Sequence, residues 1–236
     1  MRLLAHRGTI ERENTVSGIL EALRSLPQWG VELDVRFSTE RSVVLCHDRE
    51  RRNDQCDTLY HLLDTLQEHV EELFSLREIT EKPSTLPPRR AIMIDIKAFG
   101  VSGAQELGRA VCDIVESFPT LVRCADVMLC SFNEYCVSEI LAVRAVRPNT
   151  RLWERVQVGV ISSNIPLGLF EHLNGVDFVS IDYNALCEDI VDRLKEKKLP
   201  VFAWTVNADC MARLMKRYEV DGMIVDTTSE TREMYA

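Results

Sequence analysis

The sequence of 236 residues has no long uninterrupted apolar run. Its first residues, MRLLAHRG, hold no apolar stretch of signal-peptide length, and no segment reaches the roughly 18 to 20 apolar residues of a membrane span. A basic excess is also absent, because 28 Lys and Arg stand against 37 Asp and Glu, a net charge of -9. Non-specific nucleic-acid binding needs a basic face. We therefore expect a cytoplasmic protein with no transmembrane segment and no nucleic-acid partner; the oligomeric state is left unknown.

Two families of spaced motifs are missing as well. The eight cysteines include no C-x-x-C pair and no His/Cys cluster with zinc spacing. Several lie in apolar runs, such as Cys46 in VVLC and Cys130 in VMLC, which favours buried free thiols in a reducing compartment. After the first predicted strand, HRGTIERENT lacks the G-x-G-x-x-G loop of dinucleotide-binding open sheets.

Short strand-like runs do alternate with helical patterns along the whole chain. The predicted strands are residues 2–6, 30–35, 42–47, 91–97, 126–132, 150–154, 177–182, 200–206 and 222–226. The predicted helices include 14–26, 60–73, 103–118, 134–146, 186–198 and 208–218. Asn14, Thr15 and Asn207 are predicted to cap the helices that follow them.

This order predicts an α/β fold of the TIM (β/α)8 type, formed by a single domain over residues 1–236. The run at 42–47 is interpreted as an extra strand, a short hairpin return after strand two. A doubly wound open sheet is the second choice, disfavoured by the missing glycine-rich loop.

Charged residues gather where the predicted strands end, which is where TIM barrels place their active sites. In VELDV, Glu32 and Asp34 share one face of a strand, and the apolar residues between them must face the helices. In IMIDIKA, Asp95 and Lys97 point inward by the same reasoning. The sequence therefore predicts three carboxylates converging inside the barrel.

Three ionised carboxylates in a closed space repel one another, and each costs several kcal/mol if it is left unpaired. A divalent cation resolves this, and all-oxygen ligation favours Mg²⁺ or Ca²⁺ over zinc. The alternative is a metal-free network in which Arg7 and Lys97 neutralise the acids. We favour the cation, because the acids outnumber the bases at this site.

Two histidines, His6 and His47, each end a strand beside the predicted carboxylates. A histidine pair can share acid and base roles near neutral pH. With a metal ion and the fixed positive charge of Arg7 and Lys97, the set fits the hydrolysis of a phosphate diester.

The ordered set of HRG, ENT, ELDV, HD, SF, WTVN and DGMIVD resembles the glycerophosphodiester phosphodiesterases, a family of phospholipase C-like TIM barrels. The resemblance covers nearly the whole chain. It implies that His6 and His47 are the catalytic pair, and that Arg7, Lys97 and Trp204 bind the substrate. It also implies a metal at the remaining three positions, Glu32, Asp34 and Asp95, and a bracing role for Glu13 and Asn14.

Two departures from the family pattern affect the expected substrate. The family's usual third metal ligand is a glutamate, whereas Asp95 is one methylene shorter. The segment between His47 and Asp95 is also short, so we expect a reduced insertion after strand two and a more open pocket.

The sequence thus predicts a metal-dependent phosphoric diester hydrolase that releases glycerol phosphate and an alcohol from a glycerophosphodiester. The first alternative is a lysophospholipase D or sphingomyelinase D-like phospholipase acting on lysolipids. The second is a barrel that binds a diester without cleaving it.

Overall fold

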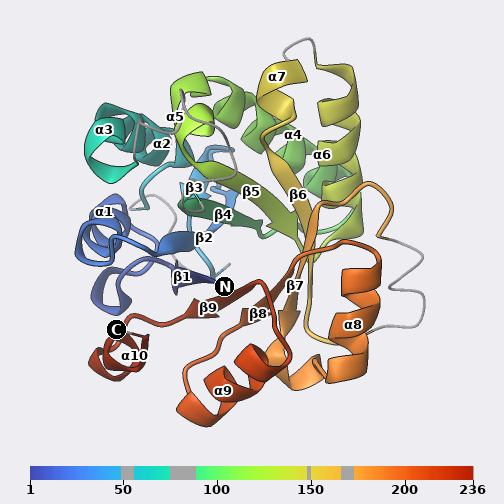
Figure 1. The fold of residues 1–236 in the computed structure, drawn as a ribbon. Helices are drawn as coiled ribbons and strands as arrows, with labels where there is room; N and C mark the ends of the chain where they lie inside the picture. Colours follow the sequence, from blue (N-terminus) through green and yellow to red (C-terminus); the bar gives the residue numbers. More distant parts are fainter. Residues whose placement is uncertain (49–55, 75–88, 148–149, 166–172, 236) are drawn as a thin grey trace.

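Eight parallel strands close into a barrel, and the helices between them form an outer layer (Figure 1). The computed structural model describes residues 1–48, 56–74, 89–147, 150–165 and 173–235. The barrel strands are β1 (Arg2–His6), β2 (Gly30–Phe37), β4 (Ala91–Ile96), β5 (Asp126–Ser131), β6 (Gln157–Ser162), β7 (Phe178–Asp182), β8 (Val201–Trp204) and β9 (Gly222–Val225). Pairing of β1 with both β2 and β9 closes the ring, which confirms the predicted TIM barrel.

A ninth strand, β3 (Val43–Leu45), pairs antiparallel with β2 and leaves the barrel uninterrupted. This confirms the predicted hairpin return after strand two. The backbone N–H of Cys46 then donates to the carbonyl of Asp34 (3.0 Å), so the chain beyond β3 returns to the top of β2. The return brings His47 to the carboxyl end of the barrel.

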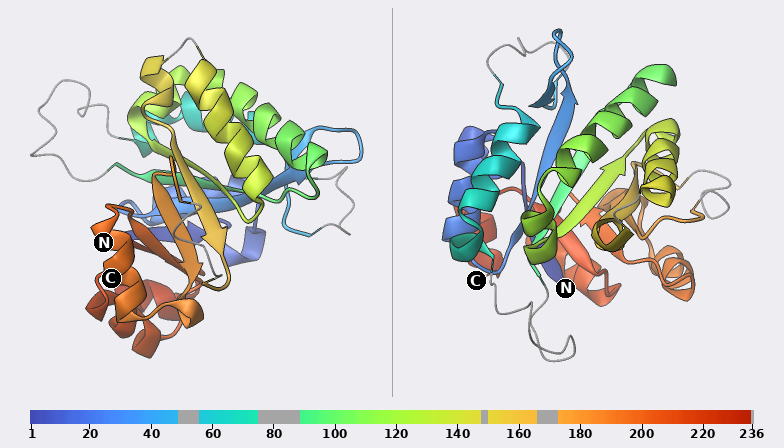
Figure 2. Two further views of the ribbon diagram at one scale, coloured as in Figure 1. Left: turned by 90° about the vertical axis from the view of Figure 1, so that its right-hand side faces the viewer. Right: turned by 90° about the horizontal axis from the view of Figure 1, so that it is seen from above.

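The helices surround the barrel on all sides, as the two turned views show (Figure 2). They are η1 (Ile10–Arg12), α1 (Val16–Ser25), α2 (Leu59–Glu68), α3 (Val70–Leu73), α4 (Ser102–Glu116), α5 (Pro119–Cys124), α6 (Glu134–Val146), α7 (Thr150–Trp153), η6 (Tyr183–Ala185), α8 (Glu188–Glu196), α9 (Asp209–Arg217) and α10 (Ser229–Tyr235). The larger core lies between this layer and the strands, where alternate strand residues such as Val31, Leu33 and Val35 are fully buried.

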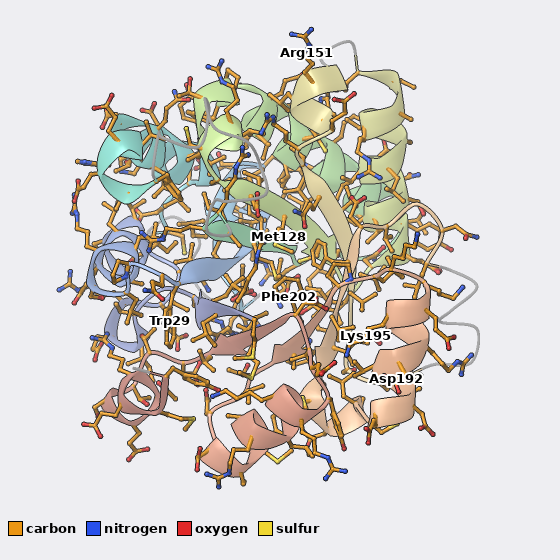
Figure 3. The ribbon with its side chains drawn as sticks, viewed as in Figure 1. Trp29, Met128, Arg151, Asp192, Lys195 and Phe202 are labelled. Carbon is orange, nitrogen blue, oxygen red and sulfur yellow. The ribbon has the colours of Figure 1, made fainter. Side chains whose placement is uncertain are left out.

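The barrel interior holds a second, smaller apolar cluster. It includes Met93, Met128 and Phe202, of which the last two are labelled near the barrel axis (Figure 3). This cluster fills the barrel below the charged residues, so the inward and outward faces predicted for β2 and β4 are confirmed.

One predicted strand, 150–154, is wrong, because Thr150–Trp153 forms helix α7. Leu152 and Trp153 are both buried, as adjacent residues of the barrel strands also are, so the short apolar run alone does not distinguish a helix from a strand. The strand lies instead at Gln157–Ser162, where Gly159 interrupts the apolar pattern. A Cβ at Gly159 would lie 2.5 Å from the Phe178 ring, so glycine is required by close packing inside the barrel.

Two of the three predicted helix caps, Asn14 and Asn207, are also wrong, because their side chains bond Asp34 and Asp226. Thr15 does cap α1, because its side chain accepts from the N–H of Gly18 (3.1 Å). Helix α9, however, begins after Ala208, and Asn207 bonds Asp226 instead of the helix. Asparagine favours the cap position because its Oδ1 accepts from a helix N–H, but in Asn207 this oxygen accepts from the N–H of Asp226 (2.9 Å).

The segment after β3 contributes α2 and α3 to the helical layer, where α2 packs against α1 and α5. Within the described residues, then, this segment forms the ordinary crossover helices of a barrel. Residues 49–55 and 75–88 lie outside the described residues, so the predicted reduced insertion is described only in part. No helix among the described residues has both the length and the apolar character of a membrane span.

Candidate active site

A cavity of about 260 Å³ opens at the carboxyl ends of the barrel strands. All eight residues predicted to bind or react line it. The full lining is His6, Arg7, Glu32, Asp34, His47, Met93, Asp95, Lys97, Phe132, Ile161, Ser180, Trp204, Thr205 and Ile224. These come from β1, β2, the turn after β3, and β4 to β9, so the fold brings together residues up to 218 positions apart (His6 to Ile224).

The three predicted carboxylates, Glu32, Asp34 and Asp95, form a compact cluster in the wall of the cavity. The β2–β4 register places Asp34 directly beside Asp95, and Glu32 lies two residues earlier on the same face. One oxygen from each lies within 4.8 Å of the others, and the exposed fractions are only 1% to 5%. Burial, reinforced by the charge of Asp34, raises the pKa of Glu32 to about 8. Such a cluster can hold a metal ion.

Two cations are already paired with these acids. Lys97 Nζ lies 3.0 Å from Asp34 Oδ1 and also contacts Asp95, and Arg7 Nε lies 2.8 Å from Asp34 Oδ2. Burial alone would lower the pKa of Lys97, but the charges of Asp95 and Asp34 outweigh it and the pKa is raised. Among the described residues Glu32 has no Lys or Arg side chain paired with it; the His6 ring lies 3.9 Å away, and the backbone N–H of Arg7 donates to Glu32 Oε2 (3.3 Å).

Asp34 is also held by the loop that follows β1. Asn14 Nδ2 donates to Asp34 Oδ2 (2.9 Å), and the Asp34 N–H donates back to Asn14 Oδ1 (2.9 Å). The N–H of Asn14 in turn donates to the carbonyl of Arg7 (2.9 Å). Both Arg7 and Asn14 have positive φ, 57° and 53°, and Gly8 between them has φ 86°. The loop therefore uses left-handed backbone to aim Arg7 at the cluster.

Glu13 and Asn14, which were both predicted to position Arg7, contact two different residues. Glu13 accepts from Arg7 Nη1 (3.1 Å), as expected. The side chain of Asn14 holds Asp34 rather than Arg7, and only its backbone reaches Arg7.

His6 is oriented by a pair of residues from the other end of the chain. Its Nδ1 lies 2.6 Å from Asp226 Oδ1, and Asn207 holds the second carboxylate oxygen (2.6 Å) and the N–H of Asp226 (2.9 Å). Burial alone would lower the pKa of His6, but the bond to Asp226 and the charge of Glu32 outweigh it, so the pKa is raised. With the proton on Nδ1 bound to Asp226, Nε2 remains directed toward Glu32 (3.9 Å).

His47 follows β3 and lines the same cavity. Its Nδ1 lies 2.8 Å from Asp48 Oδ1, and its carbonyl accepts from Arg36 (3.2 Å). The side chain is 42% exposed, against 20% for His6. One histidine of the pair is therefore enclosed and the other lies near the mouth of the cavity.

The far side of the cavity is lined by uncharged residues, most of them apolar. Trp204 ends β8 and packs edge-on against Phe132, with 5.7 Å between ring centroids. Lys97 Nζ lies 5.2 Å from the Phe132 ring centroid, so Phe132 separates the charged side from the apolar side.

The family model for the glycerophosphoryl diester phosphodiesterase family matches residues 5–230, nearly the entire chain. The chain belongs to this family. It is therefore a phosphoric diester hydrolase, as the sequence predicted. No curated protein matches it significantly.

Solved structures of family members share the fold. A phosphodiesterase from Oleispira antarctica, in complex with the product sn-glycerol-3-phosphate, has a TM-score of 0.75 at 17% identity, covering 100% of this chain and 96% of its own. A glycerophosphodiester phosphodiesterase from Parabacteroides distasonis gives 0.66 at 20% identity (99% and 95% covered). One from Thermotoga maritima gives 0.61 at 22% identity (98% and 97% covered). At these identities the likeness is one of fold.

Three features of the site escaped prediction from the sequence. The pairing of His6 with Asp226 joins residues 220 positions apart, so no local pattern in the sequence reveals it. The amide of Asn207 was assigned to a helix. Ser180 carries no sequence signal, since a serine between two apolar strand residues is common; only its inward face, known once β7 is placed, could have marked it.

Proposed function

We propose that the chain hydrolyses glycerophosphodiesters to glycerol phosphate and an alcohol, using His6 and His47 as an acid–base pair and a divalent cation held by Glu32, Asp34 and Asp95. One observation carries this proposal. Two separately oriented histidines line the same cavity as the buried carboxylate cluster and the two cations. Pure binding of a diester requires no acid–base pair, which disfavours a non-catalytic barrel.

The carboxylate cluster fits a divalent cation. Asp95 Oδ1 is buried with no hydrogen-bond partner among the described residues, and burial raises the pKa of Asp95 to about 6. Three carboxylates face two cations, Arg7 and Lys97, so the cluster has an unneutralised charge when fully ionised. An all-oxygen donor set suits Mg²⁺ or Ca²⁺. When bound, the cation would supply positive charge to stabilise the phosphoryl oxygens.

The histidines differ in what they can reach. His6 is fixed by Asp226, so its Nε2 is presented to the cavity at a constant position. His47 is fixed by Asp48 and lies closer to solvent. One of them removes a proton from the attacking oxygen and the other protonates the leaving oxygen, and in a two-step reaction through a cyclic phosphate the roles reverse. Arg7 and Lys97 hold the phosphoryl oxygens in place.

The proposal is tested by assaying a panel of glycerophosphodiesters with Mg²⁺ or Ca²⁺ and measuring release of glycerol phosphate. His6→Ala and His47→Ala should each lower turnover by about 10² to 10⁴ while metal binding, followed by calorimetry, is retained. Absence of turnover for every diester with metal present would refute the enzyme mechanism.

A second candidate, lysophospholipase D activity, is supported by an apolar rim beside the cavity. Four large side chains are 44% to 56% exposed there: Phe99, Val101, Phe132 and Tyr135. They lie on the loops after β4 and β5 and on the first turn of α6, and the two loops are tied together where Asn133 Nδ2 donates to the carbonyl of Gly100 (3.0 Å). Exposed apolar side chains beside a phosphate site suit a substrate with an acyl chain.

The two candidates separate in a matched assay with glycerophosphocholine and lysophosphatidylcholine. If the rim binds an acyl chain, Val101→Ser raises KM for the lysolipid several-fold and leaves glycerophosphocholine unaffected. Val146→Ser, which alters another exposed valine at the far end of α6 (79% exposed, against 49% for Val101), serves as the control. Equal effects of both variants would exclude acyl-chain binding at the rim.

A further inference from the structure

The cavity is divided into a charged half and a neutral half. Every charged or histidine side chain that lines it comes from β1, β2, β4 or the turns beside them. The other half, from the strands β5 to β9, contributes only uncharged residues: Phe132, Ile161, Ser180, Trp204, Thr205 and Ile224. A phosphodiester also has two parts, an anionic phosphoryl group and uncharged or cationic organic groups. The neutral half is thus the place for an organic group.

Two polar atoms in the neutral half are buried and lack partners among the described residues, namely Ser180 Oγ and Trp204 Nε1. Ser180 is 1% exposed. On β7 its side chain shares the inward face with Phe178, which lies in the interior cluster, while Val179 and Ile181 belong to the outer core. Native proteins leave few buried polar groups unpaired, so two in one half of a cavity point to a missing hydrogen-bonding group.

The chemistry of these two atoms selects the group. The Trp204 indole N–H is a donor only and needs an acceptor with a lone pair, whereas the Ser180 hydroxyl donates or accepts. An alkylammonium head cannot accept a hydrogen bond, and the neutral half has no carboxylate among its described lining residues to pair with it. Hydroxyl groups on a small uncharged carbon chain meet both requirements.

Building on the diester hydrolysis proposed above, we propose that Ser180 is a specificity-determining residue, whose hydroxyl joins the Trp204 indole N–H in hydrogen-bonding the glycerol hydroxyl of the substrate that does not attack the phosphorus. The phosphoryl group then lies toward Arg7 and Lys97. The apolar side chains of the neutral half contact the carbon chain.

The test compares two phosphate monoesters that share the charged end and differ in hydroxyl groups: glycerol 3-phosphate and methyl phosphate. Binding of each is measured by calorimetry in Mg²⁺ for the wild-type protein and for Ser180→Ala. We expect Ser180→Ala to weaken glycerol 3-phosphate about three- to tenfold, as for one neutral hydrogen bond, and to leave methyl phosphate unchanged. Ser180→Thr, which keeps the hydroxyl, should restore the preference.

Thermal stability separates this role from a structural one. Ser180→Ala removes a buried hydroxyl that has no partner, so Tm should stay the same or rise. The matched control is Ser131→Ala, because Ser131 is equally buried but donates to the carbonyl of Ile96 (2.6 Å). That variant should lower Tm and keep the wild-type ratio of the two affinities.

Three results would overturn the assignment of Ser180: an unchanged affinity ratio in Ser180→Ala, a wild-type protein that binds both monoesters equally or binds neither, or a fall in Tm like that of Ser131→Ala. The proposed function fails separately, when the wild-type protein binds the monoesters with the expected ratio yet turns over no diester.

Discussion

Replacing Asn14 tests how much its two hydrogen bonds to Asp34 contribute to the stability of the site. Asn14→Gly removes the bond to the Asp34 carboxylate and leaves the Asp34 N–H buried without an acceptor. A bond to a charged group contributes about 1.5 to 3 kcal/mol and an unpaired buried donor costs about 1 to 3 kcal/mol, so we expect unfolding to become easier by about 3 kcal/mol. Glycine adds about 0.5 to 1 kcal/mol through the entropy of the unfolded chain.

Asn14→Ala loses the same hydrogen bonds as Asn14→Gly, but the two variants differ in backbone strain. With φ at 53°, alanine costs about 1 to 2 kcal/mol in the left-handed region, which exceeds the entropic cost of glycine. Asn14→Ala should therefore be less stable than Asn14→Gly by about 0.5 to 1 kcal/mol, the reverse of the order expected in a helix. Urea unfolding at neutral pH measures both values.

The control is Asn184→Ala, because Asn184 also donates to an aspartate, Asp182 (2.9 Å), but is exposed. Its substitution should change stability by less than about 0.5 kcal/mol. The reasoning is refuted if Asn14→Gly costs under about 1 kcal/mol or if Asn14→Ala is the more stable of the pair. If Asp34 binds a cation, as proposed, both Asn14 variants should also weaken Mg²⁺ binding about 10- to 100-fold.

Three further outcomes are expected. Asp226→Asn should lower kcat and move the limb of the pH–rate profile that reports His6 to lower pH, because the bond to Asp226 raises the pKa of His6; an unmoved profile would contradict this. If the carboxylate cluster binds a cation, Mg²⁺ at 100 times its Kd should raise the unfolding free energy by about 2.7 kcal/mol in scanning calorimetry, an effect that a chelator removes and Asp95→Asn reduces. Arg90→Met should destabilise the fold by about 3 to 5 kcal/mol in urea unfolding and, in the surviving folded protein, leave KM near the wild-type value. The reason is the loss of four bonds from Arg90 to the backbone carbonyls of Leu23, Leu26, Trp29 and Leu73.

The barrel could be predicted because its strands obey a period of two so strictly. In the central part of β2 and β4 the outward residues are Val, Leu or Ile, whereas the inward face carries Glu32, Asp34 and Asp95, so the faces follow from the sequence. The pattern failed at β6. There Gly159 stands at an inward position, because any side chain would clash with the Phe178 ring. No local signal reveals that clash, since it depends on a strand 19 positions later.

For the candidate site, the sequence predicted which residues come together but not which hydrogen bonds they form. Strand ends meet at one end of a barrel, so His6, Glu32 and Asp95 could be grouped without coordinates. Hydrogen-bond partners could not be predicted in the same way, because each side chain at a strand end has several neighbours within reach. Asn207 shows the difficulty: the same amide suits a helix cap and a carboxylate, and only the position of Asp226 decides between them.

The barrel order explains why charge collects on one side of the cavity. β1, β2 and β4 are consecutive neighbours in the ring, so His6, Glu32 and Asp95 lie on adjacent strands, and the register aligns His6 with Glu32 and Asp34 with Asp95. Like charges placed this close need counter-charge from the same side, which Arg7 and Lys97 supply only in part. A diester entering such a cavity has one favourable orientation, with its phosphoryl group on the charged half. The division by strands would therefore fix the direction of the substrate before either histidine acts.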